Sequence, residues 1–336
     1  NFNTSLDWTY IVSPKFFANI SGVYTYSLSK LWSKEDFSSG EVGDGSLSNY
    51  SEHDNQSTIN DIGYRASFDY RPTPHHHLRF GHDFTFHHYR PQSSNHIYID
   101  KNGGRSDTLQ SHTASRLTAT EWNAYAEDEI RLNHRWSLNG GINVALFHIR
   151  GKTFASTDPR TAIKFQVSPR LSLKASYTTM TQFVHKISNA YIDLPSDYWV
   201  PTTRRLHPMH SHQWAAGIYM QPDKHWLLSL EGYYKCSSHL LQYTNWIGLQ
   251  PPADSWDTKV NEGKGRFFGL EFDAHYAAHR LQLDASYTLS WNKRKFDDYY
   301  PHWFYDKFDN RHKANASVRY HFGKGTSLYA EWIYHS

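Results

Sequence analysis

The sequence predicts an all-β fold, an antiparallel transmembrane β-barrel, and three features of the chain support this prediction. Apolar residues occupy every second position in stretches of about ten residues, the turns within each pair of stretches are short, and the connections between pairs are long. The clearest stretch, residues 281–292, alternates Leu, Leu, Ala, Tyr, Leu and Trp with polar residues. Such alternation gives a strand one face for lipid and one for water, as in outer-membrane barrels.

The composition agrees with a barrel. The 336 residues have a mean hydropathy of −0.73. No run of about 18 apolar residues occurs, which excludes a transmembrane helix. Aromatic residues make up 16 % of the chain, and we expect them to form belts at the two membrane surfaces. The net charge is only +3 and no nucleic-acid module is visible, so no nucleic acid is expected as a partner.

Seven short turns set the expected number of strands. Gly, Pro, Asn and Asp in these turns supply the backbone geometry of tight hairpins. Each turn lies between two alternating stretches, so we expect about fourteen strands. The predicted turns are residues 13–15, 72–76, 133–135, 168–170, 222–224, 277–279 and 323–325.

Charged residues fall almost entirely in the polar phase of the strands, as Glu127, Glu129, Glu271 and Asp273 illustrate. A Lys or Arg on the lipid face would cost about 2–4 kcal/mol at the membrane midplane, so this segregation supports the assignment. Carboxylates two residues apart could suggest glycoside hydrolysis. On one face of one strand they fit charge balance in the barrel lumen better, and we expect no enzymatic activity.

The connections at the other end of the strands are long, polar and rich in His, Tyr and Trp. In outer-membrane barrels the long loops lie outside the cell, and loops of this length usually have a function. The predicted loops are residues 29–57, 88–116, 149–160, 180–212, 236–264 and 292–310.

The single cysteine indicates the cellular compartment, and the two ends of the chain indicate how much of the domain it contains. Cys236 has no partner for an intrachain disulfide, which fits a bacterial outer membrane and an ordinary strand residue. Residues 1–4 read as a loop entering a strand rather than a signal peptide, and an alternating stretch stops just before Ser336. We therefore expect residues 1–336 to be one partial barrel domain, an excerpt of a longer protein.

Four stretches resemble the TonB-dependent receptors of Bacteroidetes-type outer membranes. They are EWNAYAEDE at residues 121–129, LPSDYWVP to LHP at residues 194–208, GKGRFFGLE at residues 263–271 and DNRHK at residues 309–313. The resemblance implies a 22-stranded barrel in a Gram-negative outer membrane, closed by an N-terminal plug. This chain would supply about 14 of those strands, without the plug and the final strands. It also implies contact with outer-membrane lipid, coupling through the plug to the inner-membrane TonB complex, and a surface lipoprotein as a candidate partner.

Side chains in two of the long loops are candidates for binding a ligand. Guanidinium groups suit carboxylates and phosphates, and aromatic rings stack on sugars, porphyrins or peptide side chains. The alternative is that the aromatic residues only stiffen the loops. The candidates are Tyr198, Trp199, Arg204, Arg205, His207, His210, Tyr243, Trp246 and Trp256.

Histidine is abundant, with 23 residues, but we expect no bound metal and no cofactor. The run His75–His77 lies in a short turn, where solvated filler is the simpler interpretation. The loop histidines His87, His88, His207 and His210 leave haem or metal capture as an open alternative, because imidazole is a common metal ligand.

The function we expect is active uptake of a scarce nutrient through a plugged barrel. Siderophore, haem, cobalamin, peptide and glycan all remain open as the cargo. A passive porin or an adhesin anchored by its barrel is the second hypothesis. A soluble all-β domain that binds or hydrolyses glycans is the third.

Overall fold

The computed structural model describes residues 1–39, 47–100, 107–114, 116–187, 198–244, 256–258, 260–298, 300–323 and 325–336. These residues form strands, with one short 3₁₀ helix, η1 (Trp256–Thr258). The strands are β1 (Phe2–Ser13), β2 (Phe16–Ser39), β3 (Leu47–Thr73), β4 (His76–Asp100), β5 (Asp107–Ala114), β6 (Leu117–Arg131), β7 (Trp136–Ile149), β8 (Lys152–Ser168), β9 (Leu171–Gln182), β10 (Val184–Ile187), β11 (Tyr198–Pro201), β12 (Met209–Met220), β13 (Trp226–Tyr243), β14 (Val260–Ala278), β15 (Leu281–Phe296), β16 (Tyr300–Tyr305), β17 (His312–Gly323) and β18 (Thr326–His335).

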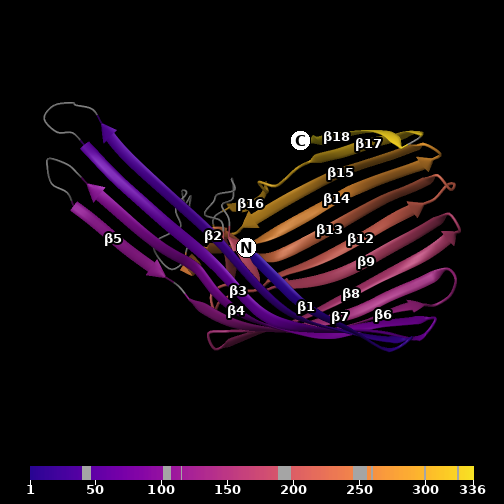
Figure 1. The fold of residues 1–336 in the computed structure, drawn as a ribbon, viewed down its shortest axis with the longest axis horizontal. Coiled ribbons are helices and arrows are strands. Elements are labelled where there is room, and N and C mark those ends of the chain that lie inside the picture. Colours follow the sequence, from indigo (N-terminus) through magenta and orange to yellow (C-terminus); the bar gives the residue numbers. More distant parts are fainter. Residues whose placement is uncertain are drawn as a thin grey trace.

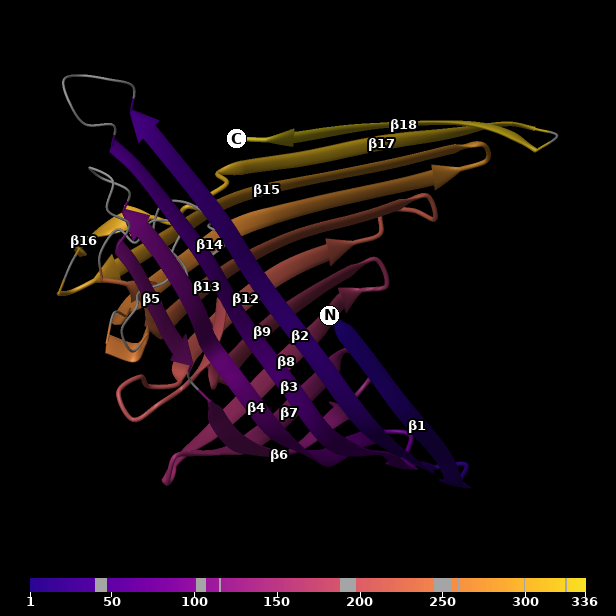
Figure 2. The ribbon, with the colours of Figure 1, turned by 60° about the vertical axis from the view of Figure 1, so that its left-hand side comes forward.

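Fourteen of these strands form one continuous antiparallel path, as expected. Its order is β1-β2-β3-β4-β6-β7-β8-β9-β12-β13-β14-β15-β17-β18, with β5 paired to β4 and β16 to β15. The sheet curves into an open trough whose edges are β1 and β18 (Figures 1 and 2). Strands β10 and β11 form a separate two-stranded sheet.

The short turns lie where the sequence predicts them, all at one end of the sheet (Figure 1). Side chains close several of them onto their own backbone. Asn133 Oδ1 accepts N–H groups of Arg135 and Trp136 at 2.8 and 3.0 Å, and Asp223 Oδ1 accepts that of His225 at 2.7 Å. Such Asx turns are the reason Asn and Asp mark hairpins in a sequence. Of the seventh turn, Lys324 lies outside the described residues, but β17 and β18 pair on either side of it.

The predicted long loops are wrong in extent, because much of them is strand. Strands β2 and β3 continue their pairing out to Ser39 and Leu47, and β13 runs to Tyr243. The segment 149–160 is reduced to the turn Arg150–Gly151, with φ of 47° and 72°, and the rest belongs to β8. Beyond the bilayer both faces of a hairpin meet water, so the backbone pairing goes on without apolar alternation.

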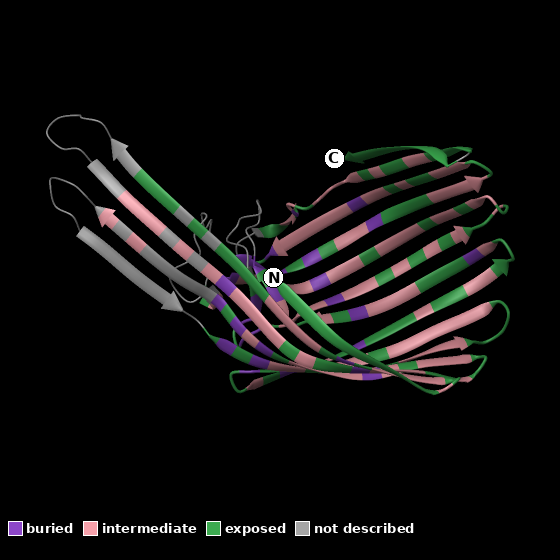
Figure 3. Cartoon of the chain, in the orientation of Figure 1, coloured by how far each residue is buried: buried purple, intermediate pink, exposed green. Residues whose placement is uncertain are grey.

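The apolar phase forms one exposed face of the sheet. Ile62, Leu230 and Leu270 are all exposed, which is unusual for large apolar residues of a soluble core. Buried residues gather instead toward the end of the sheet away from the short turns (Figure 3). This is the distribution of a barrel wall whose outer surface faces acyl chains.

Aromatic residues cross the apolar face in a continuous row. Tyr177, Trp214, Tyr234, Phe268 and Trp291 lie on five successive strands, with ring centroids 5.3, 6.1, 6.3 and 5.2 Å apart. This row, the outer aromatic row, fits one of the expected belts.

A second set of aromatic pairs lies near the short turns, with centroids 4.3 Å apart for Trp136 and Phe165 and 4.7 Å for Trp226 and Tyr276. On β14, Phe268 and Tyr276 are eight residues apart, about 27 Å along a strand. A strand tilt of about 35–45° reduces this to about 19–22 Å of height, close to the ~25 Å apolar band of outer-membrane barrels.

The opposite face carries paired charges. Glu127 lies between Arg79 and Arg160, with N–O distances of 2.7 and 3.8 Å. Asn123 Nδ2 donates to Asp83 at 3.0 Å. Glu127 and Asp83 therefore have cationic or amide partners, as charge balance in a lumen requires.

Candidate functional site

A small hairpin crosses the concave side of the sheet at its outer end. Strand β11 contacts β3 and β4 while β10 contacts β13, and five strands separate β4 from β13 in the sheet. The side chains that meet the hairpin come from the phase opposite the lipid face, since Ala145, Phe147 and Ile149 alternate with exposed Leu146. The hairpin therefore lies inside the curve of the wall.

Apolar packing fixes the hairpin in place. Phe147 is 0 % exposed and stacks on Phe183 with centroids 5.0 Å apart and an interplanar angle of 3°. Each such buried side chain contributes about 1.5–3 kcal/mol. The buried cluster contains Tyr89, Leu117, Ala119, Ala145, Phe147, Ile149, Phe154, Phe183, Ile187, Val200, Leu206, Leu241, Tyr243 and Val260.

One histidine is sealed into this packing. His185 of β10 is 3 % exposed, and its Nε2 lies 2.9 Å from Thr202 Oγ1. Burial lowers the pKa of His185 to about 4; the Glu262 carboxylate opposes this shift and His239 adds to it. The imidazole is therefore neutral at physiological pH.

A tight turn after the hairpin presents three of the predicted ligand-binding side chains. The hydroxyl of Thr203 accepts the backbone N–H groups of Arg205 and Leu206 at 3.2 and 3.3 Å, and Leu206 is buried. Because Leu206 anchors the turn, Arg204, Arg205 and His207 on either side of it are exposed.

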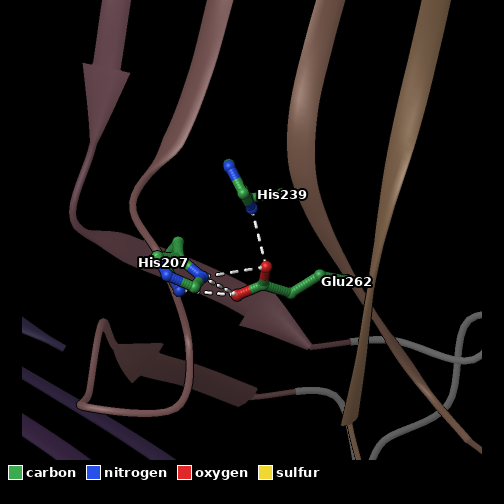
Figure 4. Close-up of side chains that lie close together, drawn as sticks. All are labelled: His207, His239 and Glu262. Carbon is green, nitrogen blue, oxygen red and sulfur yellow. Dashed lines mark hydrogen bonds and ion pairs between the residues drawn. The ribbon is translucent and has the colours of Figure 1, made fainter.

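His207 meets two residues from neighbouring strands (Figure 4). Its backbone N–H donates to Glu262 Oε1 at 2.5 Å, and its Nδ1 is 3.2 Å from both oxygens of that carboxylate. His239 Nδ1 lies 2.6 Å from Glu262 Oε2. The two imidazole rings are 5.0 Å apart. We call His207, His239 and Glu262 the His-Glu-His cluster.

The backbone places each member of the cluster. The pairing of β13 with β14 shifts register between Ser238 and Leu240, and His239 at this bulge has a φ of 58°. Bulges re-aim side chains, which explains how a residue within a long strand turns toward the segment before β12. Glu262 lies six residues before the outer aromatic row on β14, and so beyond the apolar band.

The carboxylate of the cluster is ionised at physiological pH. Burial raises the pKa of Glu262, but hydrogen bonds from the His207 backbone, the His239 ring and the His207 ring outweigh burial and hold the pKa below its ordinary value. The side chains of His207, His239 and Glu262 are 56 %, 39 % and 23 % exposed, so the cluster is open to solvent.

The other predicted residues have different places. Trp199 is exposed on β11. Tyr243 is buried in the hairpin core, where it packs rather than facing solvent. His210 Nδ1 lies 3.0 Å from Thr181 Oγ1, and its ring packs on His212, which is hydrogen-bonded to Tyr177 of the outer aromatic row. The hydrogen-bond and ring partners of His210 are therefore outside the His-Glu-His cluster.

Three predicted positions lie partly or wholly beyond what the structure describes. Trp246 is outside the described residues, and of Tyr198 and Trp256 only the backbone is described, in β11 and η1. Sequence reasoning missed His185, His239 and Glu262. Glu262 is 55 residues from His207 and 23 from His239, so no spacing motif connects them.

Among the residues that the structure describes, there is no helix with the length and hydrophobicity of a membrane-spanning segment.

A family model described as TonB dependent receptor-like, beta-barrel, matches residues 1–335. Among curated proteins, none matched the sequence. Solved structures share the fold at low identity. The FrpB iron transporter from Neisseria meningitidis has a TM-score of 0.60 at 11 % identity, over 98 % of this chain and 58 % of FrpB.

Two further solved structures have a similar fold. The ferric citrate transporter FecA in its unliganded form has a TM-score of 0.61 at 14 % identity, over 99 % of this chain and 48 % of FecA. The copper transporter OprC has a TM-score of 0.57 at 13 % identity, over 98 % of this chain and 57 % of OprC. The chain thus spans 48–58 % of the length of these three proteins. With a family match over nearly all of its sequence, a fourteen-strand path and two chemically distinct faces, the chain belongs to the TonB-dependent receptor-like β-barrel family.

Proposed function

We propose that this chain is the barrel part of a TonB-dependent receptor that actively takes up a scarce nutrient across a Gram-negative outer membrane. The family match and the two-faced wall carry this proposal. The exposed apolar face meets outer-membrane lipid, and a plug domain outside this chain couples the barrel to the inner-membrane TonB complex. The GKGRFFGLE and DNRHK stretches favour the Bacteroidetes type, in which a surface lipoprotein is a candidate partner.

The inner face supports a polar route for the cargo. Two grooves of about 660 and 650 Å³ lie along it toward the short turns. Asp273, Asp284 and Glu331 line the first, and Lys164 lines both. In this scheme the plug moves and cargo passes along these polar side chains, while the chain makes and breaks no covalent bond.

The outer end supports capture of the cargo. Trp199, Arg204, Arg205 and His207 are exposed on or beside the β10–β11 hairpin, whose buried core holds them in fixed positions. An aromatic face and two guanidinium groups suit an anionic or ring-bearing ligand. The named transporters of similar fold carry iron, ferric citrate or copper, so these cargos are tested first, then haem, cobalamin, peptides and glycans.

Nutrient-limited growth and uptake test the proposal. A strain lacking the gene is complemented with the full-length protein, in backgrounds with and without a working TonB complex, and uptake of each labelled cargo is measured. We expect uptake of one cargo that requires both the protein and TonB. Uptake that persists without TonB would instead identify a passive porin. Loss of surface attachment with no uptake defect for any cargo would identify an adhesin.

A further inference from the structure

We propose that the His-Glu-His cluster is a binding site for a divalent transition-metal ion that joins the segment before β12 to the β13–β14 hairpin. This inference goes beyond transport and does not depend on it. The three residues come from three separate segments, and their candidate ligand atoms all lie within 4.8 Å of one another. Both Nδ1 atoms point at the same carboxylate (Figure 4).

The three groups are near enough to share one ion. Metal–ligand bonds of about 2.0–2.2 Å in a tetrahedral site place ligand atoms about 3.3–3.6 Å apart. The distances from the Glu262 carboxylate to the nitrogens of His207 and His239 are 3.2 and 2.6 Å. To accept an ion between the three groups, the His239 ring must move away from the carboxylate by under about 1 Å, and each Nδ1 must be unprotonated, with the ring proton on Nε2.

The groups around the cluster also suit a bound metal ion. The His207 backbone N–H holds Glu262 Oε1 in place, as second-shell donors do at metal sites. One carboxylate and two imidazoles converge there, and the exposed rings leave a path for the ion and room for a water ligand. Imidazole with carboxylate selects zinc, copper, nickel or iron, whereas calcium and magnesium prefer oxygen ligands alone.

The position of the cluster indicates what a bound ion would do, because its ligands come from the turn before β12 and from strands β13 and β14. The residue after the buried Leu206 anchor supplies one ligand, and the β13 bulge with its β14 partner supplies the others. An ion there would fasten the Arg204–Arg205 turn to the wall. We use Zn²⁺ as the probe, because it has no redox chemistry and fits this ligand set.

Metal titration of the full-length protein in detergent, without a histidine tag and after chelator treatment, tests the site. Calorimetry with Zn²⁺ measures affinity and stoichiometry, and the visible absorption of Co²⁺ reports coordination. We expect one such ion per chain in the wild type. Even second-shell partners are worth about 10- to 100-fold in affinity, so His239→Ala, His207→Ala and Glu262→Gln should each weaken binding by at least about 100-fold.

A matched control separates the cluster from other histidines. His212→Ala removes an imidazole of β12 that contacts Tyr177, and it should leave affinity unchanged. Heat-dependent migration in gels checks that each variant folds. Absence of Zn²⁺ binding to the wild type would overturn the proposal, as would equal affinity in folded cluster variants and wild type. Should the cluster variants not fold, nitrogen and oxygen ligation of wild-type Co²⁺ supports the site, and oxygen-only ligation overturns it.

Discussion

A positive charge at the middle of the lipid face should destabilise this barrel far more than the same charge on the next residue. Leu230 of β13 is 46 % exposed and pairs with Ile218 and Phe272 of the neighbouring strands. It lies four residues from Trp226 and four from Tyr234, about 14 Å along the strand from each aromatic set. Leu230 is therefore near mid-height of the apolar band.

The magnitude follows from that position. Arg or Lys at the bilayer midplane costs about 2–4 kcal/mol, so Leu230→Arg should shift the folding equilibrium by about 30- to 700-fold. The control Ser229→Arg places the same side chain on the inner face, where Ser229 Oγ is 3.5 Å from Asp273. An exposed ion pair there contributes about 0–1 kcal/mol, so the control should be close to neutral.

Denaturant titration of the full-length protein folded into lipid vesicles, followed by tryptophan fluorescence, measures both variants. Both variants add one Arg to β13, so the difference between their free energies of unfolding cancels the effects of Arg strand propensity and of net charge. Equal destabilisation of the two variants, or a larger effect for Ser229→Arg, would refute the assignment of the two faces.

Three further predictions concern the outer end of the sheet. Phe147→Ala should weaken docking of the β10–β11 hairpin by about 3–5 kcal/mol, because the ring is 0 % exposed. Hydrogen exchange of the hairpin backbone should become faster, and unchanged exchange would contradict the role of Phe147 in holding the hairpin. Gly151→Ala should lower the free energy of unfolding by about 1–2 kcal/mol, because Gly151 has a φ of 72°. The control Gly140→Ala, where an added Cβ meets no atom within 4 Å, should not lower the denaturation midpoint. Equal midpoints for the two variants would contradict the turn geometry. The pKa of His185 is about 4 in the docked hairpin and 6.5 in solvent. Between these values the released hairpin binds a proton and the docked hairpin does not. Docking should therefore weaken by up to about 3 kcal/mol as pH falls from about 6.5 to about 4. Hydrogen exchange across that window measures this, His185→Asn should flatten the dependence, and an equal slope in both proteins would contradict it.

The bilayer explains why much of the fold could be predicted from the sequence. Lipid forces an apolar residue at every second position and forbids charge among them, so strands such as β14 and β15 are visible in the pattern alone. The short turns are equally local, because Asn133 and Asp223 close them with their own side chains. The fourteen-strand path follows from these two signals.

Outside the bilayer that constraint is absent, and prediction fails there. The outer parts of β2 and β3 do not alternate apolar with polar residues, so their sequence predicts a loop. Arg150–Gly151 makes a two-residue turn in a segment whose polarity suggested a long connection.

The candidate site could be predicted only in part, for a different physical reason. The sequence predicts His207, Arg204 and Arg205 as candidates, because polar and aromatic residues gather in one long connection. The partners of His207 could not be predicted, because a bulge turns His239 out of its strand phase and a distant strand supplies Glu262. Neither effect leaves a period or a spacing in the sequence.

A nitroxide scan along β14 tests the central claim most directly. Single cysteines replace residues 267–274 in the Cys236→Ser background of the full-length protein in vesicles, and each label is exposed to lipid-soluble oxygen or a water-soluble nickel chelate. We predict alternation at every residue, with Phe268, Leu270 and Phe272 positions favouring oxygen, and Glu271 and Asp273 positions favouring the chelate. A scan without a period of two, or with the two sets reversed, would contradict the account.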